Sequence, residues 1–147
     1  MSPSETTNKA TREEWRELGF YYETDDSRKI WRFVGSLEGL LGLPAILDQY
    51  VADPRNTLKS EHEQYGPYMY LKIMTWPEAG IVAGSIHGRL EDLSRLAELL
   101  RLKLQEQEAG SEVIVNEAYT PDYEYSLLFE VMQKGFDPAS VDPELEH

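Results

Sequence analysis

The chain has 147 residues, of which 41% are hydrophobic and 11% aromatic, and this is enough for one folded core. It contains no cysteine, which excludes disulfides, thiolate zinc sites and a cysteine nucleophile. The formal net charge of −13 at pH 7 disfavours binding to nucleic acid or to an anionic membrane and favours a basic protein partner. No apolar run has the length of a membrane span and the N-terminus has no signal-peptide core, so we expect a cytoplasmic protein.

The two ends of the chain differ in composition from its middle. Residues 1–14 are polar and rich in turn-forming residues, which predicts a disordered tail. Residues 145–147 resemble the remnant of a histidine tag, so His147 is given no functional role. We therefore expect one α+β domain over residues 15–144.

Two strands and a turn begin the predicted domain. Residues 19–24 and 29–34 have the aromatic and β-branched content of strands, and residues 25–28 between them are turn formers. We expect the two strands to pair through this turn, with Gly35 ending the second strand.

A leucine-rich helix is predicted next, over residues 37–51, with Ser36 as its N-cap. Pro44 lies inside this pattern, although proline lacks the amide donor that a helix interior needs. We therefore expect a kink or break near residues 42–44, and the end of the helix at the Asp-Pro pair of residues 53–54.

The middle of the chain is predicted as a long loop, residues 53–67, followed by two strands at residues 68–76 and 80–87. The short link at residues 77–79 predicts a hairpin between these strands. Side chains alternate between the two faces of a strand. The set expected under the helices is Met69, Leu71 and Ile73, and the set expected on the open face is Tyr68, Tyr70, Lys72 and Trp76.

A second helix is predicted over residues 90–107, with leucines on one face and charged residues on the other. Residues 113–115 predict a short edge strand and residues 124–132 a longer one. The side chains of the longer strand that we expect in the core are Tyr125, Leu127, Phe129 and Val131.

An internal repeat relates the two halves of the chain. The features that match in order are Gly35 with Gly88, Leu40 with Leu93, and Tyr65-Gly66-Pro67 with Tyr119-Thr120-Pro121. Duplicated βαβ units predict a ferredoxin-like fold, which is one antiparallel sheet with two helices on one face and here an extra N-terminal strand.

The open sheet face and the loop before it supply the candidate binding residues. Exposed aromatic side chains bring a large contact area at little entropic cost, so an aromatic face indicates an interaction surface. In an extended chain Glu61 and Glu63 share one side and His62 the other, which does not favour a metal site. The candidate binding residues are Glu61, His62, Glu63, Tyr68, Tyr70 and Trp76. We expect no catalytic residue, metal or other cofactor.

The segment SIHGRLEDLSRLAELL, followed after a gap by a strand, resembles predicted immunity proteins of bacterial polymorphic toxin systems, in the family numbered thirty-two. The resemblance implies a small α+β domain that binds and neutralises one cognate toxin, with no catalytic residues. The acidic composition suits a basic toxin such as a nuclease.

The first hypothesis is therefore a non-enzymatic, acidic binding protein that acts as an immunity-type inhibitor. One alternative is a small enzyme or metal-binding protein that uses Glu61, His62, Glu63 and His87. The other is a structural homodimer that pairs its open sheets.

Overall fold

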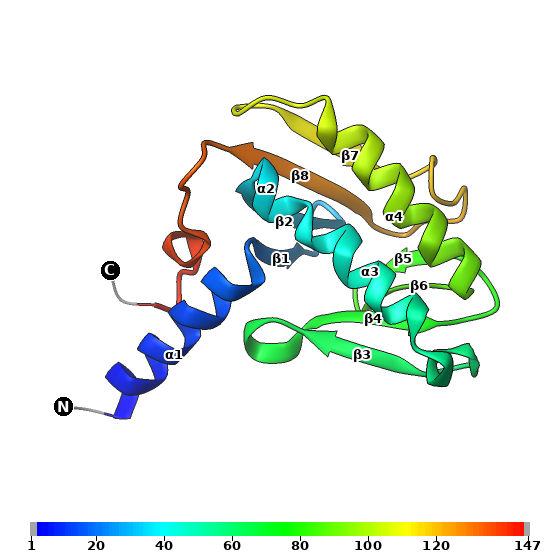
Figure 1. Ribbon diagram of the computed structural model, residues 1–147, viewed down its shortest axis with the longest axis horizontal. Helices are drawn as coiled ribbons and strands as arrows, with labels where there is room; N and C mark the ends of the chain where they lie inside the picture. The colour runs from blue at the N-terminus through cyan, green and yellow to red at the C-terminus, as the bar shows by residue number, and fades with distance from the viewer. Residues whose placement is uncertain (1–2, 146–147) are drawn as a thin grey trace.

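Two four-stranded sheets and a layer of helices make up the computed structural model, which describes residues 3–145 (Figure 1). The helices are α1 (Pro3–Leu18), α2 (Leu37–Leu40), α3 (Gly42–Ala52) and α4 (Leu90–Gln105). The strands are β1 (Tyr21–Asp25), β2 (Ile30–Ser36), β3 (His62–Tyr65), β4 (Leu71–Thr75), β5 (Gly80–Val82), β6 (Ser85–Gly88), β7 (Glu112–Val115) and β8 (Ser126–Met132). Short 3-10 helices are η1 (Pro54–Thr57), η2 (Pro67–Met69) and η3 (Pro138–Val141). The predicted α+β class is confirmed.

Both sheets follow the same plan. The strand order is β1-β2-β8-β7 in the first sheet and β3-β4-β6-β5 in the second. In each sheet the central pair is parallel, whereas both outer pairs are antiparallel. The predicted single antiparallel sheet of a ferredoxin-like fold is therefore wrong. The reason is that β8 pairs with β2 and β4 pairs with β6. The last two strands of each half of the chain therefore lie in a sheet with the first two strands of the other half.

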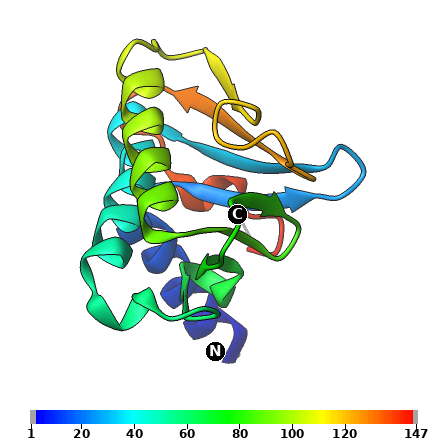
Figure 2. The ribbon, with the colours of Figure 1, turned by 90° about the vertical axis from the view of Figure 1, so that its right-hand side faces the viewer.

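The predicted repeat is present in the order of the elements. Each half runs strand, strand, helix, strand, strand, and each sheet combines the first strand pair of one half with the second pair of the other. Leu40 and Leu93, which the repeat aligns, are both fully buried. Helices α3 and α4 pack together on one side of the strands, as predicted (Figure 2).

The first of these helices is interrupted where Pro44 predicts a break. Helix α2 ends at Leu40 and α3 begins at Gly42, whereas α4 is continuous. Pro44 falls in the first turn of α3, where a missing amide hydrogen needs no partner. Ser36 caps α2, because its Oγ accepts a hydrogen bond from the amide of Gly39 at 3.1 Å.

Several predicted strands have other bounds or partners. The strand predicted at residues 68–76 begins only at Leu71, because η2 takes up the residues before it. The region predicted as one strand at residues 80–87 is two strands, β5 and β6, with a turn at Ala83-Gly84. The hairpin predicted through residues 77–79 is wrong, because β4 pairs in parallel with β6. Strand β3 was not predicted, since its side chains at a sheet edge are largely exposed and lack an alternating pattern.

For the first two and the last two strands of the chain, the predictions agree better with the structure. Strands β1 and β2 are antiparallel, and β7 is an edge strand. The four side chains of the last strand region that were predicted in the core, Tyr125, Leu127, Phe129 and Val131, are all buried. Phe129 stacks on Phe33 with ring centroids 5.0 Å apart, which joins β8 to β2 in the core.

The N-terminal region is a helix rather than the predicted tail. Within α1, Thr11 and Trp15 are buried, and Arg16 forms an exposed ion pair of 2.9 Å with Asp137. At the other end, Leu145 of the predicted tag remnant is buried in the core. Residues 1, 2, 146 and 147, on which parts of both end predictions fall, lie outside the described residues.

Candidate binding site

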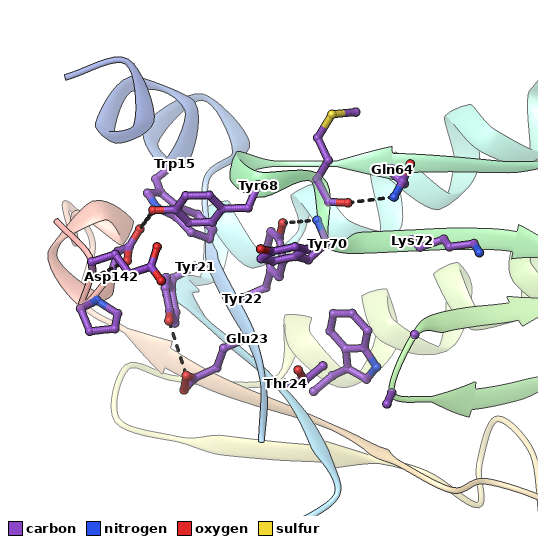
Figure 3. Close-up of a pocket in the computed structure, with 16 residues that line it drawn as sticks. Trp15, Tyr21, Tyr22, Glu23, Thr24, Gln64, Tyr68, Tyr70, Lys72 and Asp142 are labelled. Carbon is purple, nitrogen blue, oxygen red and sulfur yellow. Dashed lines mark hydrogen bonds between the residues drawn. The ribbon is translucent and has the colours of Figure 1, made fainter. Parts of the chain in front are cut away.

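A groove of about 570 Å³ lies where the β1 edge of the first sheet faces the second sheet (Figure 3). Its walls come from α1, β1, β2, β3, η2, β4, the β5–β6 turn and the segment after η3. The aromatic side chains that line it are Trp15, Tyr21, Tyr22, Trp31, Tyr68 and Tyr70. Its size is that of a small-molecule or side-chain pocket, which typically spans about 300–1,000 Å³.

One wall of the groove is formed by Tyr68, Met69 and Tyr70, which we call the aromatic knob. Their exposed fractions are 40%, 56% and 70%, so three consecutive large side chains face solvent. Tyr68 and Met69 have φ values of 65° and 57°, in the left-handed region. Residues other than glycine adopt this conformation at a cost of about 1–2 kcal/mol each. The knob therefore needs support from the rest of the fold.

Tyr22 of β1 provides part of that support. Its hydroxyl donates to the carbonyl of Pro67 at 2.6 Å and accepts from the amide of Tyr70 at 3.1 Å. Burial raises the pKa of Tyr22 further above neutral pH. A second contact holds the knob from β3, where the Gln64 side-chain amide donates to the carbonyl of Met69 at 3.2 Å.

Asp142 fixes the knob from the C-terminal segment. Its buried carboxylate accepts hydrogen bonds from the Tyr68 hydroxyl at 2.7 Å and from Trp15 Nε1 at 2.8 Å. The rings of Trp15 and Tyr68 also meet edge to face, with centroids 6.2 Å apart. Burial, and then the hydrogen bond to Asp142, raise the pKa of Tyr68 well above its usual value. Three distant parts of the chain thus meet at one carboxylate.

The charged side chains of the groove are mostly acidic. They are the carboxylates of Glu23, Asp142 and Glu144 and the amine of Lys72. Glu23 also pairs with Arg32 at 2.8 Å, and Arg32 contacts Glu130 on its other side. The Tyr21 hydroxyl donates to Glu23 at 3.4 Å, and the pKa of Tyr21 is raised by burial and then by this carboxylate.

The structure brings together only some of the predicted site residues. Tyr68 and Tyr70 line the groove, but Tyr68 lies in η2 and Tyr70 directly follows it, so neither is on a strand face. Met69, which was predicted under the helices, is exposed beside them for the same reason. Trp76 lies outside the groove, where the amine of Lys59 sits 4.7 Å from its ring centroid.

The Glu61-His62-Glu63 triplet is exposed and does not line the groove. His62 and Glu63 are neighbours on β3, so their side chains point to opposite faces. The Nδ1 atom of His62 lies 3.1 Å from the carbonyl oxygen of Ser60. The described residues include no group of three or more side chains suited to holding a metal ion.

The two histidines of the enzymatic alternative lie on the same face of the second sheet but on different strands. His62 and His87 are both register partners of Met74, which lies between them on β4. Ser85 Oγ is 3.1 Å from Nδ1 of His87. Burial lowers the pKa of His87, while the charge of Glu78 opposes this shift. The imidazole therefore favours its neutral form in the folded protein.

Sequence reasoning missed most of the groove. The sequence predicts Trp15 as the first residue of the domain, directly after a tail, and it gives no role to Asp142 or Glu144. A signal for the C-terminal segment was present in its Asp-Pro pairs, since Asp137 N-caps η3 by accepting from the amide of Ala139 at 3.1 Å. No local signal indicates that Asp142, five residues later, reaches Trp15 and Tyr68.

No protein-family model, no curated protein and no solved structure matches this chain. Among residues 3–145, no helix is long and apolar enough to cross a membrane. A functional assignment therefore depends on the geometry and charge of the groove and of the aromatic knob.

Proposed function

We propose that this chain is a non-enzymatic binding protein for a basic protein partner, and that it acts as an immunity-type inhibitor of a bacterial toxin. The observation that carries the binding proposal is the aromatic knob, where Tyr68, Met69 and Tyr70 are exposed and the backbone of the first two is strained. The toxin is proposed on the resemblance of residues 85–100 to immunity proteins and on the net charge of −13.

Strain and exposure together favour a recognition role for the knob. Two consecutive left-handed residues persist only where surrounding contacts impose them, and such residues cluster at functional sites. The contacts of Tyr22, Gln64 and Asp142 impose the conformation in the free protein. A partner that packs on the knob would not have to order it, so less binding energy would be lost. Tyrosine is also a residue type in which binding energy concentrates.

The acidic surface supports a basic partner. Opposite charges accelerate the encounter of two proteins and suppress wrong partners, and this effect declines as salt is added. Glu61 and Glu63 are exposed on the β3 side of the molecule, and they fit a role as rim contacts in such a complex.

A cell-protection assay tests the proposal. The chain is co-expressed with the product of a neighbouring toxin-like gene, and survival is compared for the parent, Tyr70→Asp and Leu102→Asp. Leu102 on α4 is the matched control, because its exposed fraction of 60% is close to that of Tyr70 but it lies outside the groove. We expect protection by the parent and by Leu102→Asp, and loss of protection by Tyr70→Asp.

Two results would contradict the proposal in different ways. If the parent does not protect, the toxin assignment is wrong. If Tyr70→Asp protects as well as the parent does, the knob is not the interface. The homodimer alternative is checked by light scattering on the purified protein, where it requires a mass of twice 16.9 kDa.

A further inference from the structure

We propose that the groove beside the aromatic knob receives a basic side chain of the protein partner, with arginine preferred. This inference rests on the proposed function, because the knob forms one wall of the groove. It adds the chemistry of the group that the groove recognises.

The aromatic lining of the groove suits an organic cation. Its six aromatic rings come from α1, β1, β2 and the η2 region, and the two that are open to a ligand are those of Tyr68 and Tyr70, because the other four are at most 5% exposed. Tyr68 lies between Trp15 and Tyr70, with ring centroids 6.2 Å and 5.9 Å away. Aromatic faces attract ammonium and guanidinium groups, and sets of rings around a pocket are the usual receptor for organic cations.

The charges of the groove favour the same ligand. Three carboxylates, those of Glu23, Asp142 and Glu144, line it together with one amine, that of Lys72. Arg32 neutralises part of Glu23, and Asp142 is engaged by Trp15 and Tyr68. Glu144 is exposed at the rim, and it is the carboxylate best placed to meet an incoming cation. The balance remains negative, so an anionic ligand is disfavoured.

Arginine fits this combination better than a compact cation does. Its planar guanidinium can stack on a ring and donate hydrogen bonds in the same plane. The chain pairs arginine in this way elsewhere: the guanidinium of Arg95 lies 5.2 Å from the ring centroid of Tyr119 and donates to the carbonyl of that residue at 2.9 Å. A groove of about 570 Å³ also has room for the whole side chain and the adjoining backbone.

The test uses a small probe, N-acetyl-arginine methylamide, titrated into the full chain and followed by nuclear magnetic resonance. The citrulline analogue is the matched probe, since it has nearly the same shape without the charge. The indole N–H signals of Trp15 and Trp31 report on the groove, and that of Trp76 is an internal control outside it. We expect the arginine probe to shift the first two signals and to bind at least about fivefold more tightly than citrulline.

Two variants that each remove one charge from the groove should change the affinity for the arginine probe in opposite directions. Glu144→Gln should weaken binding of the arginine probe about two- to fivefold, whereas Lys72→Gln should strengthen it by a similar factor. Glu108→Gln is the control for a charge change away from the groove, and it should leave the affinity unchanged. Unchanged thermal midpoints establish that each variant remains folded.

The proposal is wrong if the arginine probe does not shift the Trp15 and Trp31 signals, if citrulline binds equally well, or if Lys72→Gln weakens binding. These results are independent of the protection assay. If the probe fails but Tyr70→Asp still loses protection, only the arginine inference is overturned. If the probe binds while Tyr70→Asp protects normally, the groove is a cation site and the knob is not the toxin interface.

Discussion

The carboxylate of Asp142 joins α1, η2 and the C-terminal segment, so its removal tests how the knob is held. It accepts hydrogen bonds from Trp15 Nε1 at 2.8 Å and from the Tyr68 hydroxyl at 2.7 Å. In Asp142→Ala the buried indole of Trp15 loses this acceptor. A buried donor left without a partner costs about 1–3 kcal/mol.

The Tyr68 hydroxyl adds a smaller loss. Because Tyr68 is 40% exposed, its hydroxyl can turn to water, and we assign about 0.5–1 kcal/mol to this contact. The total is roughly 1.5–4 kcal/mol, a large share of the about 5–15 kcal/mol that stabilises a typical domain. For a chain of this size the unfolding midpoint should fall by roughly 3–16 °C.

Urea titration followed by tryptophan fluorescence measures the free energy of unfolding of each variant. Tyr68→Phe removes one of the two hydrogen bonds and should cost about 1 kcal/mol or less. Asp122→Ala, an exposed aspartate outside the groove, is the control. The carboxylate does not hold these segments together if the free energy of unfolding of Asp142→Ala is within about 0.5 kcal/mol of that of the parent. The same conclusion follows if Asp142→Ala loses no more free energy of unfolding than Tyr68→Phe does.

Glu61→Gln combined with Glu63→Gln should change the free energy of unfolding by less than about 0.5 kcal/mol, because both side chains are exposed. The pair should slow association with a basic partner at low salt, and stopped-flow rates that are equal at low salt would exclude a rim contact. Lys29→Gly should raise the free energy of unfolding in urea by about 0.5 kcal/mol, since Lys29 has a φ of 54° that glycine adopts freely. A destabilised variant would show that the contacts of the Lys29 amine with Glu124 and the Tyr125 ring outweigh this strain. Burial lowers the folded pKa of His87, so the stability that its neutral form contributes is present above the unfolded pKa of about 6.5 and is lost as the pH falls toward the folded pKa. His87→Gln should therefore lose stability less steeply than the parent between pH 7 and pH 5, and equal slopes would count against this account.

Local pattern was sufficient for the two leucine-rich helical regions and for the repeat, although not for α1. The leucine spacing of α4, the capping by Ser36 and the break at Pro44 depend on interactions within a few residues along the chain. Such interactions can be recognised in the sequence, because helix hydrogen bonds and caps join near neighbours. The alignment of Leu40 with Leu93 followed from the same periodicity, and both are buried.

Strand partners could not be predicted in this way. The sequence marked most strand regions, but β2 pairs with β8 and β4 with β6, which are partners that no local pattern specifies. A strand exposes the same hydrogen-bonding groups to any neighbour, so its partner depends on how the whole chain packs. One expected sheet consequently became two, each shared between the halves of the repeat.

The groove is likewise a product of tertiary structure. The sequence identified Tyr68 and Tyr70 as exposed aromatic residues, but it placed them on a regular strand. The left-handed turn at Tyr68 and Met69 is held by Tyr22 and Asp142, from distant parts of the chain, together with nearby Gln64. Local preference alone disfavours that backbone at a tyrosine or methionine, so only long-range contacts could select it.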